Sequence, residues 1–390
     1  MSSSANLLVI SSAPGSSEDG KLILDRKFVE GMKFYTKSWA GKTACLLRAP
    51  RSENLFTGQF DPEDLPFAVH LRPAGHHLTA DDLKDYQVIL ASGDNHEYLH
   101  VADLARKAGK AAFYTIEYTP QTRRQIVMLD PNRSLPSRIK SLLNIALTER
   151  RRRRAFRQAA GLQANGYPAA DLYRQINPNT VFYLDNRITK DLLVTDAEMA
   201  ARQSHLQGDG PVRLIHSGRL EPMKGSQDLI PIARRMRDQG ANFVLDIFGG
   251  GSLEAGIRQD IQTHNLGEYV RLHGVVDYET ELVPFARQNS DIFLSCHRQS
   301  DPSCSYLENM GCGLAVAGYA NLMWTALAQD SQAGWVVPLG DWQALADKLI
   351  DLTRNRADIR TKSGIAAVFA RQHLFSAEFA KRIAQMSNLK

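Results

Sequence analysis

The sequence predicts an α/β protein with two domains, each built on a parallel sheet that helices cover on both faces. The chain has 390 residues, of which 43% are apolar. This length exceeds that of an ordinary domain with a single hydrophobic core. Short apolar runs alternate with amphipathic helical patterns, as in sheets joined by helical crossovers. The series restarts after a polar stretch at residues 186–212, which contains "QGDGP". We therefore expect domains at 1–190 and 191–369, with a final helix in 370–390 that packs on the first domain or stays with the second.

The first half begins with an apolar strand at residues 6–15, which we expect to enter a Gly/Ser loop. Residues 21–39 predict a helix, because large apolar side chains recur at helical spacing from Leu24 to Trp39. Further strands are expected at 43–50, 67–74, 86–94, 110–118 and 161–166. Helices at 96–109 and 136–160 lie between them.

The second half repeats this alternation with clearer punctuation by glycine. Strands are expected at 212–220, 242–251, 270–276, 291–296 and 314–319. Helices are expected at 226–240, 253–267, 278–290, 305–313, 341–355 and 376–389.

Composition narrows the class and the location. The sequence contains no run of eighteen apolar residues, so we expect no transmembrane helix. The N-terminal stretch lacks the basic residues with which a secretory signal begins. Four cysteines are too few for a disulfide framework, so we expect a reducing cytoplasm. Residues 1–190 carry 27 Lys and Arg against 19 Asp and Glu. This excess suits an anionic partner such as a lipid surface, a phosphorylated acceptor or nucleic acid, although a solvated face without a partner explains it equally well.

The arginine run Arg150–Arg154 is the strongest local charge feature, with Phe156 beside it. Five consecutive arginines cannot all face one side of a helix. Contact with anionic lipid at the inner face of a membrane fits this pattern, as does a merely solvated helix. Nucleic acid fits the run less well, since no basic face interleaved with aromatics accompanies it, and we expect no nucleic-acid partner.

The strongest signal for chemistry is "HSGRLEPMKGSQDLI", residues 216–230. A strand ends at Gly218, Arg219 follows, and Lys224 precedes a helix, on the side where open parallel sheets bind ligands. An arginine fork with a lysine point charge can clamp a diphosphate, although both cations also suit an ordinary surface turn. A second glycine loop begins at Gly249 and allows a ligand to approach the backbone closely.

Other site classes are not supported. The second glycine loop lacks the acidic residue of a dinucleotide fingerprint, which argues against NAD. The cysteines do not have zinc spacing, and neither a Walker loop nor a nucleophile elbow is present.

Six segments in this order resemble retaining GT-B glycosyltransferases of glycosyltransferase family four (glycosyl transferases group 1). They are "SGRLEPMKG", "LDIFGGG", "VRLHGVV", "SDIFLSC", "YLENMGCGLAVAGY" and "GWVVPLGDWQALADKL". The resemblance implies a GT-B fold, in which two Rossmann-like domains face each other across a cleft. It also implies a nucleotide-sugar donor on the C-terminal domain and an acceptor on the N-terminal one.

The resemblance assigns donor contacts residue by residue. It implies that Arg219 and Lys224 hold the diphosphate, with Gly218 and Gly249 beside it, and that Glu308 accepts hydrogen bonds from the ribose. His273 and Val275 would border the nucleobase. The amides near Cys304, Ser305 and Tyr306 would face the phosphates.

The family's first glutamate is missing from this chain. It precedes the second by eight residues, a position that Ser300 occupies here. Asp301 is the nearest carboxylate, one residue later and one methylene shorter. Either Asp301 takes over the contact with the transferred sugar, or the site binds the donor without that contact.

The first half offers weaker candidates. The loop expected around Gly15 and Gly20 would close over donor phosphates or acceptor. Glu117, after the strand at 110–118, is a candidate catalytic or acceptor contact, and Asp94 and His96 follow another strand. Loop capping explains each of these as well as function does.

The expected activity is transfer of a sugar from a UDP-sugar or GDP-sugar to a glycan, glycolipid or small acceptor. The resemblance implies retention without a metal or further cofactor, with Arg219, Lys224, Asp301 and Glu117 as the catalytic set. Two alternatives remain: a catalytically reduced GT-B protein that binds a nucleotide sugar or glycan, and a related epimerase acting on the donor itself.

Overall fold

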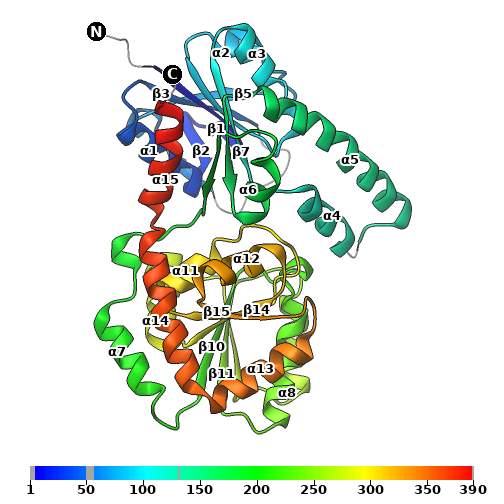
Figure 1. Ribbon diagram of the computed structural model, residues 1–390, viewed down its shortest axis with the longest axis vertical. Coiled ribbons are helices and arrows are strands. Elements are labelled where there is room, and N and C mark those ends of the chain that lie inside the picture. Colours follow the sequence, from blue (N-terminus) through cyan, green and yellow to red (C-terminus); the bar gives the residue numbers. More distant parts are fainter. Residues whose placement is uncertain (1–4, 50–56, 131, 389–390) are drawn as a thin grey trace. The chain divides into compact units, whose positions relative to one another are not determined.

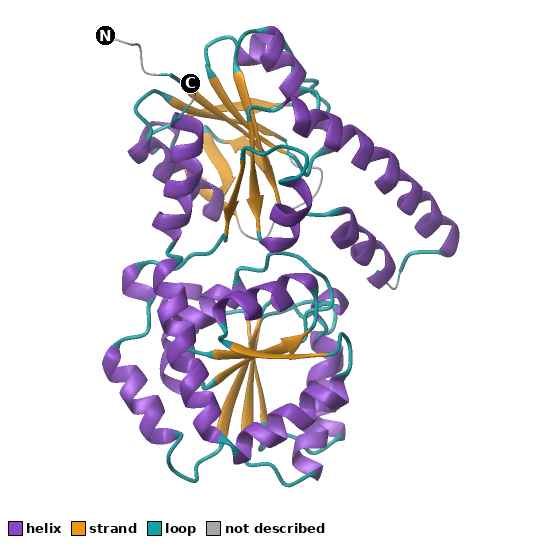
Figure 2. Ribbon diagram, viewed as in Figure 1, coloured by secondary structure: helices purple, strands orange, loops and turns teal. Residues whose placement is uncertain are grey.

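The computed structural model describes residues 5–49, 57–130 and 132–388, which form two compact units (Figure 1). Unit 1 combines Met1–Pro120, Leu143–Tyr183 and Ser376–Lys390, and unit 2 combines Gln121–Leu142 and Leu184–Phe375. Each unit contains one mainly or wholly parallel sheet flanked by helices, so the predicted α/β class is confirmed (Figure 2). The chain divides near residue 184, and residues 121–142 from its first half belong to unit 2.

The sheet of unit 1 contains nine strands among the described residues. Seven run parallel in the order β5-β3-β1-β6-β7-β8-β9, and β1 continues into an antiparallel ribbon with β2 and β4. The strands are β1 (Leu7–Glu18), β2 (Lys21–Asp25), β3 (Thr43–Arg48), β4 (Thr57–Phe60), β5 (Ala68–Arg72), β6 (Val88–Ser92), β7 (Ala111–Ile116), β8 (Gly161–Asn165) and β9 (Thr180–Tyr183).

Helices complete unit 1, and the chain's last helix returns to it. Arg382 on that helix donates to the Gln163 Oε1 atom on β8 at 2.9 Å, and Phe379 packs its ring against Tyr35. The helices are α1 (Arg26–Ser38), α2 (Ala80–Leu83), α3 (Val101–Lys107), the C-terminal part of α5 (Leu135–Gln158), α6 (Tyr167–Tyr173) and α15 (Phe375–Ser387).

The start of the chain differs from the sequence expectation. The predicted Gly/Ser loop is instead the β1–β2 hairpin, with Gly15 paired to Leu24, and it turns at Gly20, where φ is positive. The predicted helix at 21–39 begins only at Arg26, because the Asp25 carboxylate accepts from the Phe28 N–H and caps it. Helical spacing of apolar residues therefore misassigned a strand whose side chains alternate between buried and exposed.

Unit 2 has six parallel strands in the order β12-β11-β10-β13-β14-β15 within the described residues. This is the doubly wound order, whose reversal between β10 and β13 places a ligand crevice at the carboxyl ends of those strands. The strands are β10 (Val212–Ser217), β11 (Phe243–Phe248), β12 (Val270–Gly274), β13 (Ile292–Ser295), β14 (Ala315–Tyr319) and β15 (Gly334–Val337). The five strands predicted in this half are confirmed, and β15 was not predicted.

Unit 2 also contains helices. They are α4 (Pro120–Leu129), the first part of α5, α7 (Asp196–His205), α8 (Leu229–Asp238), α9 (Glu254–Thr263), α10 (Val283–Asn289), α11 (Ser305–Gly311), α12 (Leu322–Ser331), α13 (Trp342–Arg354) and α14 (Arg356–Gln372). No helix among the described residues is long and apolar enough to span a bilayer.

The polar stretch at 186–212 is structured rather than a simple linker. Thr195 and Glu198 form a capping box that starts α7. Arg202 on α7 is buried and donates to the carbonyls of Ser290 at 2.8 Å and Gly313 at 2.8 Å. These bonds fix α7 to the ends of β13 and β14.

Candidate functional site

The site begins at the carboxyl end of β10, where two glycines approach closely. Gly249 has φ +118°, and a Cβ there would lie 1.9 Å from the Gly218 carbonyl oxygen, so only glycine fits. Gly218 has φ +149°, and a Cβ there would meet no described atom within 4 Å. The backbone beside Arg219 is thus open, and the Arg219 side chain is exposed.

Lys224 and Asp301 form an ion pair beside this backbone. The Lys224 Nζ atom lies 2.7 Å from the Asp301 Oδ2 atom, and the two side chains are only 8% and 13% exposed. The other carboxylate oxygen, Oδ1, is buried and has no hydrogen-bond partner among the described residues. The N–H groups of Arg298 and Gln299 donate to the Met223 carbonyl, which ties the two loops together.

Two buried imidazoles lie next to this ion pair. His216 shares a hydrogen bond between Nδ1 and the Leu294 carbonyl at 3.0 Å, while its Nε2 atom has no partner among the described residues. Burial lowers the pKa of His216 to about 4. Burial, and then the charge of Lys224, holds the pKa of His297 well below its usual range. Both rings are therefore neutral near pH 7, so they can donate or accept a hydrogen bond.

Four unpartnered polar atoms belong to residues at or just after the carboxyl ends of β10 and β13. Within the described residues, His216 Nε2, His297 Nδ1, Gln299 Oε1 and Asp301 Oδ1 are all buried without a hydrogen-bond partner. Such groups are costly unless a ligand or water satisfies them. Because Lys224 follows β10 and Asp301 follows β13, these strand ends indicate a site for a polar ligand. Sequence reasoning missed the two histidines and Gln299, whose only signal was their position at strand ends.

Glu308 on α11 is held by an arginine that the sequence did not suggest. Arg187 donates through Nε to Oε1 at 2.8 Å and through Nη2 to Oε2 at 2.9 Å. The guanidinium also lies over the Tyr278 ring, 3.5 Å from its centroid. Burial alone would lower the pKa of Arg187, but the Glu308 carboxylate outweighs it and raises that pKa. Two of the roughly four lone-pair positions on Glu308 stay available for a ligand.

Ser300 has a structural role at the position of the missing glutamate. Its hydroxyl accepts from the Leu322 N–H at 3.1 Å, and its own N–H donates to the Gln125 Oε1 atom at 2.8 Å. The buried hydroxyl joins the loop to α12, and the backbone N–H joins it to α4. Asp301 is therefore the carboxylate of this loop that reaches Lys224.

The start of α11 separates the three residues predicted there. Tyr306 is buried, accepts from Ser295 and Asn321 through its hydroxyl, and stacks on Trp324, so its side chain belongs to the core. Ser305 shares a 2.8 Å hydrogen bond with Ser303, and Cys304 points its Sγ atom toward Asp185. Any phosphate contact here would come from the backbone N–H groups of the first turn.

The ends of β11 and β12 provide an aromatic and aliphatic edge. His273 lies 2.7 Å from the Asp246 carboxylate through Nε2 and stacks on Phe248 at 4.2 Å between ring centroids. Val275 is 74% exposed, an unusual state for valine. The exposed Val275 side chain beside Gly250 offers an apolar surface against which a planar ring can pack.

The candidates in the first half belong to unit 1. Glu117 follows β7, and its N–H donates to the Asp94 carboxylate at 2.6 Å, so Asp94 caps this loop. Gly15 lies within β1, where a Cβ would come within 2.8 Å of the Leu47 side chain. The loop expected around Gly15 is therefore wrong, since close packing of β1 accounts for that glycine. His96 is exposed in a short turn.

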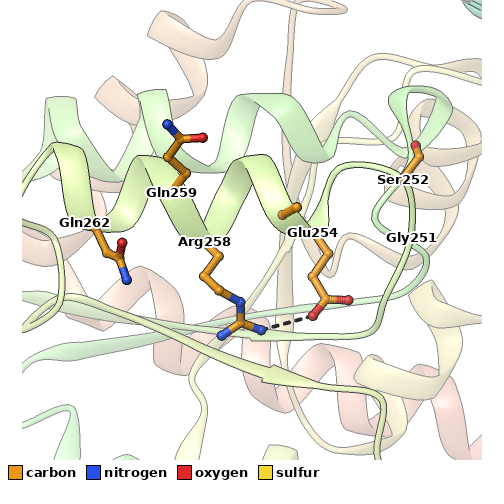
Figure 3. Close-up of a pocket in the computed structure, with 7 residues that line it drawn as sticks. Gly251, Ser252, Glu254, Arg258, Gln259 and Gln262 are labelled. Atoms are coloured by element: carbon orange, nitrogen blue, oxygen red, sulfur yellow. Dashed lines mark hydrogen bonds and ion pairs between the residues drawn. The ribbon is translucent and has the colours of Figure 1, made fainter.

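A separate hollow lies along α9 (Figure 3). It has a volume of about 580 Å³, and two of its lining residues, Glu254 and Arg258, form an ion pair at 3.1 Å. Its lining is Gly251, Ser252, Glu254, Ala255, Arg258, Gln259 and Gln262. None of the predicted donor residues lines it. No cluster of three or more metal-ligating side chains occurs in the described part of the chain.

Comparison with known proteins gives a family match in the second half of the chain. Residues 198–367 match the family model of Glycosyl transferases group 1. The Erwinia amylovora protein "Amylovoran biosynthesis glycosyltransferase AmsK" is 28% identical over 179 residues, which is 45% of this chain and 42% of the relative. The chain thus matches less than half the length of that relative. The matched residues include all six segments on which the resemblance to Glycosyl transferases group 1 rests.

Solved structures share the fold across nearly the whole chain. Anabaena Alr3699/HepE in complex with UDP matches with a TM-score of 0.65 at 16% identity, covering 98% of each chain. WaaG, a glycosyltransferase involved in lipopolysaccharide biosynthesis, matches with a TM-score of 0.66 at 11% identity, covering 98% of this chain and 100% of WaaG. The two Rossmann-like units therefore have the GT-B fold.

Proposed function

We propose that the chain is a retaining, metal-independent glycosyltransferase of the hexosyltransferase type. It takes a sugar from a UDP-sugar or GDP-sugar and transfers it to a glycan, glycolipid or small acceptor. The observation that carries this proposal is the Lys224–Asp301 ion pair among buried, unpartnered polar atoms at the switch point of unit 2. No metal or further cofactor is part of the proposal.

The donor-binding roles follow from the chemistry of each group. Arg219 is exposed and free to reach a diphosphate as a fork, while Lys224 supplies a point charge. Glu308 accepts from the ribose hydroxyls through lone pairs that Arg187 leaves open. The base packs on Val275, and the transferred sugar lies near Asp301 Oδ1 and the buried imidazoles.

The reaction is a front-face substitution at the anomeric carbon. The bond from that carbon to the diphosphate oxygen breaks, with its electron pair leaving on the nucleotide. The acceptor oxygen bonds to the same face, and its proton passes to the departing phosphate oxygen. Positive charge from Arg219 and Lys224 stabilises the leaving group, since negative charge develops there in the transition state. We assign Glu117 to the acceptor side as a candidate contact.

UDP is the first nucleotide to test, because HepE is described in complex with it. The purified chain is incubated with UDP-glucose or UDP-N-acetylglucosamine, and released UDP is measured with and without acceptor glycans. Transfer, or slow donor hydrolysis that Lys224→Ala abolishes, supports the proposal.

The alternatives predict different products in the same assay. Donor binding without any release of UDP favours a catalytically reduced binding protein. Conversion of UDP-N-acetylglucosamine to another nucleotide sugar without acceptor favours an epimerase.

A further inference from the structure

Helix α5 exposes a row of large apolar side chains. Leu135, Ile139, Leu143 and Leu147 are 72%, 61%, 63% and 59% exposed. Residues four apart lie on one face of a helix, so these four form a continuous apolar stripe. A surface helix normally turns such a stripe toward the core, but the buried positions of α5 are Arg152, Ala155 and Phe156. A contiguous exposed apolar row marks an interaction surface.

The same face becomes cationic toward the C-terminal end of the helix. Arg150 and Arg154 lie seven residues after Leu143 and Leu147, which keeps them on the face of the stripe, and Arg151 lies beside them. All three are exposed, and none forms an ion pair with a described residue. The whole helix carries eight Arg and Lys against one Glu. We call the apolar row with these three arginines the α5 face.

The remaining arginines of the run have structural partners. Arg152 is buried and donates to the Gly93 carbonyl at 3.1 Å, the Asp94 carboxylate at 3.1 Å and Glu149 at 3.3 Å. Arg153 donates to Glu149 at 2.9 Å. Phe156 is buried, so it offers no apolar contact to a partner. The run is therefore divided between holding the fold and facing outward.

Residues of the loop after α4 hold the first turns of α5. Arg138 donates to the Asp130 carbonyl at 2.9 Å, and Arg133 donates to the Ser141 hydroxyl at 2.8 Å. With 24 residues, α5 is about 36 Å long, so the α5 face extends over most of a helix that is held in place.

We propose that the α5 face docks on an anionic lipid bilayer. The apolar stripe enters the boundary between headgroups and acyl chains, and Arg150, Arg151 and Arg154 contact lipid phosphates. A nucleic acid would leave the leucines in water, and a second copy of the same face would bring like charges together. The charge and the apolar row thus select an anionic membrane. The proposal stands on α5 alone and is independent of the transferase activity.

Vesicle co-sedimentation of the full chain tests this proposal. We expect binding to phosphatidylcholine vesicles containing phosphatidylglycerol, little binding to pure phosphatidylcholine, and weaker binding as salt rises. Replacing Arg150, Arg151 and Arg154 by Gln should weaken binding about a hundredfold, at about a factor of five for each cation. The double change Leu143→Gln and Leu147→Gln should weaken it about tenfold or more.

Matched controls separate docking from folding. Val368→Gln alters an exposed apolar side chain on α14 and should leave binding unchanged, while thermal melts check that every variant folds. Binding that survives both the arginine and the leucine changes overturns the proposal. So does a folded wild-type chain that ignores anionic vesicles. Concentration-dependent dimers that Leu143→Gln and Leu147→Gln break would overturn it in favour of a second copy.

Discussion

Replacing Lys224 by Ala separates the contribution of this lysine to folding from its contribution to catalysis. The change leaves the Asp301 carboxylate buried, with neither oxygen bonded to a cation. Breaking a buried ion pair in this way costs about 3 kcal/mol of unfolding free energy. Loss of one charge from the leaving-group site should lower kcat by about 10²- to 10³-fold. Urea unfolding and steady-state UDP release at saturating donor measure the two effects.

The double variant Lys224→Ala, Asp301→Ala makes the separation sharp. Removing both charges relieves the unpaired carboxylate, so about 2 kcal/mol of the lost stability should return. Activity should stay low, because the cation is still absent. Arg213→Ala is the matched control, since it breaks a buried ion pair with Asp291 at the opposite end of β10. It should lower stability and leave kcat unchanged, and a Lys224→Ala enzyme with wild-type kcat would refute the clamp.

Three further predictions follow from other parts of the molecule. Arg187→Ala removes both hydrogen bonds that orient Glu308, so the KM for the donor should rise about tenfold. Arg187→Lys should recover only part of this loss, and an unchanged KM in Arg187→Ala would contradict the role of Arg187. Arg152→Gln should lower the free energy of unfolding, measured in urea, by about 3 kcal/mol. The same change at its exposed neighbour, Arg151→Gln, should lower it by less than about 0.5 kcal/mol. Equal losses would contradict the assignment of Arg152 to the fold and Arg151 to the surface. Burial lowers the pKa of His216 to about 4, so below pH 6.5 the unfolded chain binds a proton that the folded chain does not. As pH drops from 6.5 to 4, the free energy of unfolding should therefore fall by about 3 kcal/mol more in the wild-type chain than in His216→Asn. A slope that His216→Asn leaves intact would contradict this assignment.

Local patterns in the sequence predicted the fold because alternation and helical spacing are set within a few residues. The strand ending at Gly218 and the cations after it follow directly from such a pattern. The β1–β2 hairpin was mistaken because Leu24 fits both helical spacing and strand alternation. Capping by Asp25 decided between them, and that depends on a single side chain.

The site itself depends on pairs that no local pattern encodes. Arg187 and Glu308 are 121 residues apart, and Arg187 lies in the polar stretch where the sequence predicted the domain boundary. The resemblance identified Ser300 as a departure from the family, but only the structure shows its contact: the Ser300 hydroxyl accepts from the Leu322 N–H. Likewise, only the folded structure shows that nitrogens of His216 and His297 are buried without a hydrogen-bond partner among the described residues.

Direct binding of nucleoside diphosphates tests the central claim that unit 2 holds a nucleotide-sugar donor. Thermal unfolding of the full chain is measured with UDP, GDP, ADP and their common sugar conjugates, alongside the Lys224→Ala variant. A ligand at a hundred times its Kd adds about 2.7 kcal/mol of stability. We predict that one diphosphate and one of its sugar conjugates stabilise the wild-type chain, and that Lys224→Ala loses both shifts. If no nucleotide stabilises the folded wild-type chain, the account is contradicted.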